Sequence, residues 1–440
     1  MKNNKTAEFY DIALSFAGEN RNYVEKLANV LRSRKVNVFY DLFKKVDLWG
    51  KDLYQYLSEI YQNKAVYTVI FISKHYKSKH WANHELRSAQ ARAFEDNEEY
   101  ILPAKFDDTE IPGIRKTTGY VDLNSTTPDE LASMICQKLD DMAKHFADLR
   151  YIDDIGSLYE LSLNKLLAVT EWCYRNEKYQ EVIKLSGKVD FFLQKEIQWT
   201  KRKKYLNMAL QAANNLGQES LVFGFKRNIA TIAMNQGDFN ESLKLSEEVA
   251  TIAEKHRDNS EIFDAYHAIG RVYEAKGDYE KATKSYTKAL DISRSFLSER
   301  NSSNTIHELA VVMYRMKQYK KAEELYKEAI EIANMTGFDF IKSCSLHGLG
   351  LLYQYTSSGM QNIELSEEYY IKSLEIKKKA NDQEEIARTE YQLADLYYES
   401  GKYKDALDLI KHCVNVFEKT DHRYLGQARF LMSQISEKCS

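Results

Sequence analysis

The chain has 440 residues, 44% of them hydrophobic and 29% charged, and its formal net charge is −3. This composition indicates a globular protein with room for two or three domains, and the near-neutral balance excludes a global basic surface for nucleic acid or anionic membranes. The first residues, MKNNKTAEFYD, lack the apolar segment of a secretory signal, and the longest apolar run, AVYTVIFI at 65–72, is too short to span a bilayer. Five cysteines without CxxC spacing predict neither a disulfide framework nor a zinc site, so we expect a cytoplasmic protein.

Short β-prone segments alternate with helical ones over the first 145 residues. We expect strands at 10–16, 36–41, 65–73, 100–107 and 119–123, and helices at 21–34, 53–63, 81–95 and 127–146. Thr127 and Pro128 give the last of these helices a favourable start. The alternation predicts a parallel sheet with helices on both faces.

Ligands of such sheets bind beyond the carboxyl ends of the strands. Three segments end up there: SFAGEN at 15–20, the loop that follows Asp41, and SKHYKSKHW at 73–81. We therefore expect these segments to converge on one rim of the sheet, which is the predicted ligand site.

Three sequence boxes in this region resemble those of Toll/interleukin-1 receptor (TIR) domains. They are YDIALSFAGEN at 10–20, VNVFYDLFKKVDLWGKDL at 36–53 and TVIFISKHYKSKHWANHEL at 68–86. Their order and spacing agree with the family, and they are more similar to bacterial members than to animal receptor adaptors. The resemblance covers about residues 9–140 and implies an α/β flavodoxin-like TIR domain spanning residues 1–145.

One branch of the TIR family cleaves NAD+ at the bond between nicotinamide and ribose. The resemblance implies that Glu85, in the WxxxEL position, is the catalytic residue, with NAD+ as substrate and no further cofactor. A single carboxylate suffices because nicotinamide in NAD+ is already a cationic leaving group, so only an oxocarbenium-like ribose needs stabilising. Attack by water would give ADP-ribose and attack by an adenine nitrogen a cyclic isomer; the sequence does not choose between them.

Further substrate-binding residues follow from their positions in the resemblance. Trp81, one helical turn before Glu85, would form a wall of the pocket, and Phe16 and Ala17 would line its nicotinamide side. Trp49 lies in the 41–53 loop, which in the family contacts neighbouring TIR domains and completes the active site. We therefore expect the TIR domains of different copies to associate.

These residues also have plainer interpretations. The alternative for Glu85 is a solvated residue on a helix. The alternative for Trp81 is a half-buried packing residue. His80 and His84 have the i, i+4 spacing of a zinc pair, but HWANHE lacks the internal glutamate of HExxH and no third ligand is evident nearby. We expect no metal site.

The C-terminal two-thirds of the chain is a repeat array. No proline occurs after Pro128, as expected for an uninterrupted series of helices. Turn residues recur every 40 positions, apart from four extra residues in YTSSGMQN, and a small residue precedes each of them in phase. The turn residues are Phe239, Tyr279, Tyr319, Ile363 and Tyr403, and the small residues are Ala230, Gly270, Ala310, Gly350 and Ala394.

This pattern resembles long tetratricopeptide repeats (TPR), although it lacks the proline at the repeat end and has a weak copy at Ile363. We expect an all-α TPR-type solenoid of about five repeats plus a capping helix at 218–440. A helical connector at 146–217 would hold one degenerate repeat with its turn at Tyr179. Such arrays present a long concave surface that binds a protein or peptide.

The sequence thus predicts an NAD+ glycohydrolase or cyclase that is regulated by a TPR sensor. By resemblance, such architectures act in anti-phage defence. The alternative is a non-enzymatic adaptor, with the TIR domain for self-association and the repeats for cargo. The expected partners are NAD+, a protein or peptide ligand and other copies of the chain, without nucleic acid or membrane.

Overall fold

The structure, a computed structural model, describes residues 9–40, 60–61, 64–78, 100–112, 114, 118–148, 161–195, 198–355, 359–420 and 424–439. The chain divides into two compact units, Met1–Phe225 and Lys226–Ser440, and each is described by itself. Glu85, Trp81 and Trp49 lie outside the described residues.

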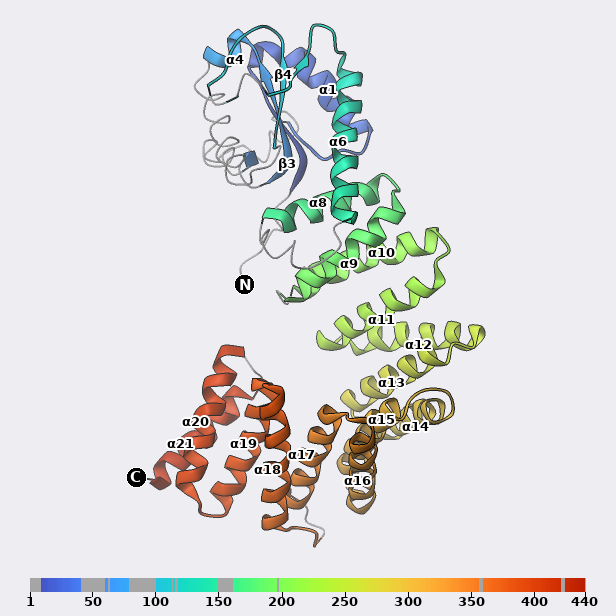
Figure 1. The fold of residues 1–440 in the computed structure, drawn as a ribbon, viewed down its shortest axis with the longest axis vertical. Helices are drawn as coiled ribbons and strands as arrows, with labels where there is room; N and C mark the ends of the chain where they lie inside the picture. Colours follow the sequence, from blue (N-terminus) through green and yellow to red (C-terminus); the bar gives the residue numbers. More distant parts are fainter. Residues whose placement is uncertain are drawn as a thin grey trace. The chain divides into compact units, whose positions relative to one another are not determined.

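A five-stranded parallel sheet forms the centre of the first unit (Figure 1). Its strands are β1 Tyr10–Ser15, β2 Val38–Phe39, β3 Ala65–Ile72, β4 Ile101–Lys105 and β5 Val121–Asp122. They lie in the order β2-β1-β3-β4-β5, with Ser15 paired to Ile70 and Ile72 paired to Lys105. The predicted strands and their parallel arrangement are confirmed, and the order of a flavodoxin-like sheet places its switch point between β1 and β3.

Alternating side chains of β3 build two apolar clusters, one on each face of the sheet. Val69 and Phe71 pack with the helices α1, Arg21–Ser33, and α6, Pro128–Asp148, which lie side by side (Figure 1). Ile70 and Ile72 belong to the other cluster, which also holds tyrosines from the segments around them. All eight residues of β3 are buried, as expected for a central parallel strand.

The start of α6 follows the sequence prediction. The Glu130 carboxylate accepts hydrogen bonds from the backbone N–H and the hydroxyl of Thr127, each at 2.8 Å. In return the Glu130 N–H donates to Thr127 Oγ1 at 3.3 Å. This reciprocal capping satisfies groups that the first helical turn leaves without partners.

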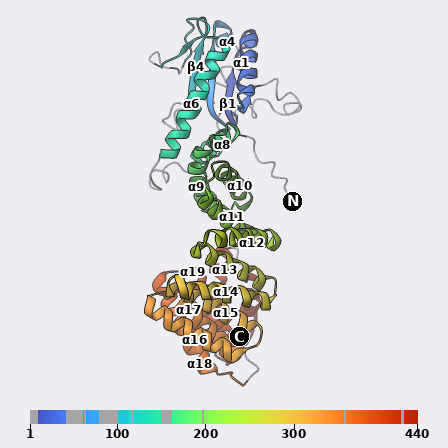
Figure 2. The same cartoon turned by 90° about the vertical axis from the view of Figure 1, so that its right-hand side faces the viewer.

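Helices complete the first unit and make up all the described regular structure of the second (Figure 2). In the first unit these are α4 Lys74–Ser78, α8 Leu161–Arg175, α9 Tyr179–Lys195 and α10 Trp199–Asn215, with the 3-10 helix η1 Gly18–Asn20; α11 Glu219–Asn235 crosses the boundary. Those of the second unit are α12 Phe239–His256, α13 Asn259–Ala275, α14 Tyr279–Phe296, α15 Glu299–Arg315, α16 Tyr319–Thr336, α17 Asp339–Tyr355, α18 Ile363–Ala380, α19 Gln383–Glu399, α20 Tyr403–Thr420 and α21 Leu425–Cys439. Each predicted turn residue is the first residue of a helix, and the insertion lies between α17 and α18.

The small residues permit close packing within each helix pair. A Cβ atom built on Gly270 would lie 2.6 Å from the Tyr286 ring, and one on Gly350 would lie 2.5 Å from the Tyr370 ring. Any larger side chain would therefore collide with the tyrosine of the second helix. The prediction that these glycines let the helices approach is confirmed.

Candidate active site

The segments that follow β1 and β3 meet at the carboxyl rim of the sheet. Ser73, which is 1% exposed, donates its hydroxyl proton to Asn20 Oδ1 at 2.8 Å. Ser73 Oγ in turn accepts a hydrogen bond from the Tyr76 N–H at 3.2 Å. The predicted convergence of 15–20 with the segment after β3 is confirmed at the switch point, while the loop after Asp41 lies outside the described residues.

Phe16 forms an aromatic pair at this rim. Its half-buried ring stacks on Tyr40, which follows β2, with 5.6 Å between centroids and 27° between planes. The Arg21 guanidinium carbon lies 5.1 Å from the Phe16 centroid, and Arg21 Nη1 donates to the Tyr40 hydroxyl at 3.4 Å. Tyr40 is fully buried and supports the Phe16 ring from below, so the half-buried Phe16 ring beside the Arg21 cation is the part that suits a planar ligand with negative charge.

Ala17 is placed differently from Phe16. It is 2% exposed, and its side chain belongs to the apolar cluster that contains Tyr61 and Tyr76. Its backbone oxygen accepts the Asn20 N–H at 2.9 Å and so shapes η1. The substrate-lining role of Ala17 stays a prediction, and a contact with substrate would have to come from its backbone.

Buried tyrosines hold the end of β1. The Tyr76 hydroxyl lies 2.7 Å from Ser15 Oγ, and the Tyr61 hydroxyl donates to the Leu14 carbonyl at 3.0 Å. The Tyr100 hydroxyl in turn donates to the Tyr61 carbonyl at 2.7 Å. Because all three tyrosines are at most 2% exposed, these bonds fix the strand end that leads to Phe16.

Asp107 places a carboxylate at the end of β4. It accepts hydrogen bonds from the N–H groups of Lys74, at 2.9 Å, and Thr109, at 3.0 Å. Partial burial acts to raise the pKa of Asp107, but these hydrogen bonds outweigh it and hold the pKa below its usual value. The carboxylate therefore stays charged and anchors the start of α4.

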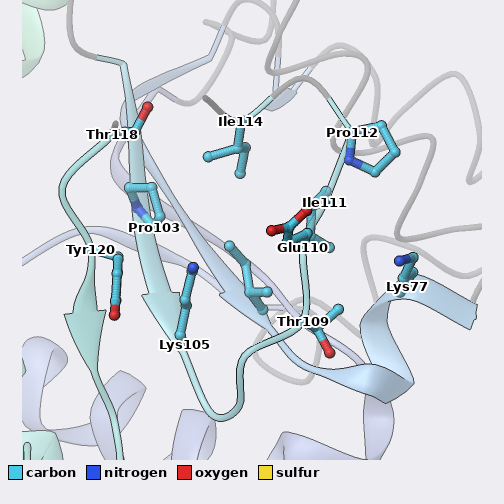
Figure 3. A pocket seen from close by; sticks show the side chains of 11 residues that line it. Lys77, Pro103, Lys105, Thr109, Glu110, Ile111, Pro112, Ile114, Thr118 and Tyr120 are labelled. Carbon is cyan, nitrogen blue, oxygen red and sulfur yellow. The ribbon is translucent and has the colours of Figure 1, made fainter. Parts of the chain in front are cut away.

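A cavity of about 490 Å³ lies on the β3–β4–β5 side of the rim (Figure 3). Its lining residues are Ile72, Lys77, Pro103, Lys105, Thr109, Glu110, Ile111, Pro112, Ile114, Thr118 and Tyr120. The Lys105 ammonium lies 4.1 Å from the centre of the Tyr120 ring. The described lining comes from β3, β4 and adjoining segments, so the cavity is separate from the aromatic pair beside β1 and β2.

Most of the predicted site lies outside the residues that the structure describes. Glu85, Trp81 and Trp49, with His80 and His84, fall outside the described residues. Over the described ranges, no group of three or more His, Cys, Asp or Glu side chains could hold a metal ion. In the same ranges no helix is long and apolar enough to cross a membrane.

The sequence prediction placed Asn20 and Ser73 in the converging segments without giving either a role, and it did not single out Arg21 or Asp107. Each follows a strand end within six residues, so the strand boundaries were the available signal. Their polar partners depend on how the strands are ordered in the sheet. The sequence indicates that order only through the family resemblance.

The repeat array contains a second set of enclosed polar groups, a series of three histidines 40 residues apart. Each histidine hydrogen-bonds to the first helix of the following pair. The pairs are His267 Nε2 with Asn304 Nδ2 at 3.2 Å, His307 Nδ1 with Ser345 Oγ at 2.9 Å, and His347 Nδ1 with Thr389 Oγ1 at 3.1 Å. Burial lowers the pKa of His267 and His307 to about 4, and that of His347 well below its usual value.

Family models match both parts of the chain. Residues 12–136 match the TIR domain. Residues 223–295 and 358–419 match one tetratricopeptide repeat model, and 303–336 match another. These matches agree with the expected order of domains.

Comparison with curated proteins finds a relative of the N-terminal region. Over 130 residues the chain is 65% identical to the 3′ cyclic ADP-D-ribose synthase AaTIR of Aquimarina amphilecti. The match covers 30% of this chain and 40% of that protein, so the chain spans less than half of the relative's length.

Comparison with solved structures finds more distant similarities. BtubC (BKLC) from P. vanneervenii is 19% identical, with 51% of this chain and 92% of that chain covered and a TM-score of 0.43. The apo form of RapI is 16% identical, with 64% and 97% covered and a TM-score of 0.44. These similarities are too distant to bear on function.

Proposed function

We propose that this chain, which carries an N-terminal TIR domain followed by tetratricopeptide repeats, cleaves NAD+ at the nicotinamide–ribose bond and forms a cyclic ADP-ribose. The observation that supports this most strongly is the 65% identity with a 3′ cyclic ADP-D-ribose synthase. Identity at that level over 130 residues favours the same reaction class over an adaptor role.

In the proposed reaction the bond between the nicotinamide nitrogen and the ribose carbon breaks. Nicotinamide leaves as a neutral molecule with the bonding electron pair, and the ribose becomes oxocarbenium-like. The Glu85 carboxylate stabilises that positive charge and orients the ribose hydroxyls. A nucleophile of the same molecule then closes the ring and gives up its proton, whereas attack by water would give linear ADP-ribose.

The rim of the sheet offers suitable supports for NAD+. The half-buried Phe16 ring, supported by the buried Tyr40, suits a planar base, and the adjacent Arg21 suits the pyrophosphate. The hydrogen bond between Ser73 and Asn20 orders the start of the segment that leads to Glu85. These residues would hold the substrate while Glu85 acts on the ribose.

We propose further that the repeat array is a sensor for a protein or peptide ligand. Binding there would promote association of TIR domains through the 41–53 loop, with Trp49 and Trp81 completing the pocket. A role in anti-phage defence belongs to the same proposal and rests on the domain architecture.

The test is nicotinamide release from NAD+ by the purified chain, with products separated by chromatography. A second sample is the 1–225 fragment at high concentration, since those residues form a compact unit and include only the first eight residues of the array at 218–440. Glu85→Gln should lower the rate by about 100-fold or more. The matched control is Glu25→Gln, which changes an exposed glutamate of α1 and should leave the rate unchanged.

Each unfavourable result has a distinct meaning. Background release from both samples would favour the non-enzymatic adaptor. Unchanged release from Glu85→Gln would refute the assignment of the catalytic residue, and linear ADP-ribose as the sole product would refute cyclisation.

A further inference from the structure

Helix α8 packs against β1 and β3 at the amino end of the TIR sheet, and α9 packs against α8 and α6; we call these two helices the collar. The collar and the sheet share one continuous apolar cluster. It includes Ile12, Leu14, Val66 and Val69 from the sheet, Leu139 and Ala143 from α6, and Leu166, Val169, Trp172, Cys173, Val182 and Leu185 from the collar. Since Trp172 is 2% exposed and Cys173 is fully buried, the collar is part of the domain's core.

A buried ion pair lies where the collar meets β1. Arg175, the last residue of α8, donates from Nη2 to Asp11 Oδ2 at 2.6 Å, and that side chain of Asp11 is 2% exposed. The same oxygen accepts the Asn37 N–H at 2.7 Å, and Arg175 Nε donates to the Lys35 carbonyl at 3.0 Å. Arg175 thus bonds to β1 and to the segment before β2 at once.

Other charged contacts fasten the collar around this pair. Lys35 binds Glu177 at 3.0 Å, and Lys178 binds Asp140 of α6 at 2.6 Å. The Lys188 ammonium of α9 donates to backbone carbonyls in the last turn of α6. These contacts are more exposed than the Asp11 pair, so each is worth less to the free energy of folding.

We propose that Arg175 is a positioning residue for the carboxyl rim, and that the collar controls the rim through β1. Asp11 stands at the start of this six-residue strand, and Ser15, bonded to Tyr76, stands at its end. Phe16 and η1 follow directly. Because all six residues of β1 are buried and close-packed, a displacement at Asp11 would be transmitted along the strand to Ser15.

The chemistry of Asp11 makes this connection conditional on Arg175. Burial raises the pKa of Asp11 to about 6, although Arg175 and the Asn37 N–H both act to lower it. At neutral pH the carboxylate is therefore charged in surroundings that disfavour charge, and Arg175 is its ionic partner. Withdrawing the arginine removes a group that lowers this pKa, so the buried carboxyl would take up a proton, and the bonds of Arg175 to Asp11 and to the Lys35 carbonyl would be lost, which is destabilising locally.

The experiment measures amide hydrogen exchange and NAD+ turnover in full-length Arg175→Met, Arg175→Lys and Arg34→Met. Arg34 is the matched control: its side chain is 30% exposed against 31% for Arg175, but it pairs with Asp129 inside the domain. Arg175→Met should raise exchange across residues 12–20 by about tenfold and raise KM for NAD+ more than it lowers kcat. Arg175→Lys, which keeps the charge, should recover part of both effects, and Arg34→Met should alter neither.

Two results would overturn the proposal. In the first, exchange rises in α8 and α9 while residues 12–20 keep the wild-type rate. In the second, Arg34→Met raises exchange at residues 12–20 as much as Arg175→Met does, which indicates general destabilisation. The KM measurement rests on the proposed function, whereas the hydrogen-exchange measurement does not. A chain inactive on NAD+ would therefore refute the expected change in KM, and hydrogen exchange alone would then decide the proposal. If Arg175→Met does not fold, hydrogen exchange at residues 12–20 is compared between wild type, Arg175→Lys and Asp11→Asn instead.

Discussion

Protonation of His307 should destabilise the repeat array as the pH falls from 6.5 to 4. The ring lies between Ser345, 2.9 Å from Nδ1, and the Tyr326 ring, 5.7 Å away between centroids. Burial lowers the pKa of His307 from 6.5 to about 4, Lys377 lowers it further, and Glu385 acts in the opposite direction. Each pKa unit corresponds to about 1.4 kcal/mol, so the full shift corresponds to about 3 kcal/mol, and partial solvent contact of the ring reduces this to about 2 kcal/mol.

The sign follows from which state binds the proton. Below pH 6.5 the unfolded chain protonates His307, whereas the folded chain does not until about pH 4. The stabilisation is therefore complete above pH 6.5 and is lost as the pH falls through this window. Glu308 acts oppositely, because burial raises its pKa to about 7 and the folded state then gains stability as the carboxyl group protonates. The pH dependence of the wild-type free energy of unfolding therefore contains the effects of both His307 and Glu308.

The assay therefore compares wild type with His307→Gln, which keeps a group able to hydrogen-bond Ser345 but does not titrate. Urea unfolding followed by circular dichroism gives the free energy of unfolding at several pH values. The wild-type advantage over the variant should shrink by about 2 kcal/mol between pH 7 and pH 4.5. His256→Gln, at an exposed position in α12, is the control. A difference between wild type and His307→Gln that is independent of pH would refute the reasoning.

Two further predictions concern the rim and the repeats. Ser73→Ala removes the donor to Asn20 and the acceptor of the Tyr76 N–H. Thermal unfolding should therefore show a free energy of unfolding lower by about 1–3 kcal/mol, and NAD+ assays should show a raised KM. If both quantities stay unchanged, the role given to this bond is wrong. Gly270→Ala should destabilise by about 1–3 kcal/mol in urea, because its Cβ would overlap the Tyr286 ring. Gly224→Ala, in a helix with open space around the position, should instead stabilise by up to about 1 kcal/mol, and a similar gain at Gly270 would show that the two helices separate readily.

The parts of the fold that the sequence predicts well are those encoded locally. AVYTVIFI is apolar without interruption, and a parallel central strand requires that pattern. The repeats were predictable because every helix pair reuses one set of turn and small residues, so the pattern within forty residues predicts the structure of each pair. The convergence of SFAGEN with the segment after β3 followed from parallel topology alone.

The contacts missed by the sequence prediction join residues that are distant along the chain. Asp11 and Arg175 are 164 positions apart, and neither residue belongs to a recognisable pattern. The connector was predicted as a separate helical segment, because helical periodicity shows which face is apolar and not which surface covers it. The sequence also did not predict the contacts among Phe16, Tyr40 and Arg21, because these contacts depend on β2 lying next to β1.

The two ends of β1 set an energetic condition on any regulation of the rim. A displacement of α8 either carries the buried strand with it or breaks the bond between Arg175 and Asp11. Removing one partner of a fully buried ion pair costs about 3–5 kcal/mol, and because the Arg175 side chain is 31% exposed, breaking this bond costs at most about 3 kcal/mol. A ligand can shift an equilibrium only by its difference in binding free energy between the two states. A regulator that acts by breaking this bond must therefore bind the displaced state up to about 150-fold more tightly, at about 1.4 kcal/mol for each factor of ten. A weakly discriminating ligand would leave the bond intact, and could regulate the rim only by moving β1 as a body.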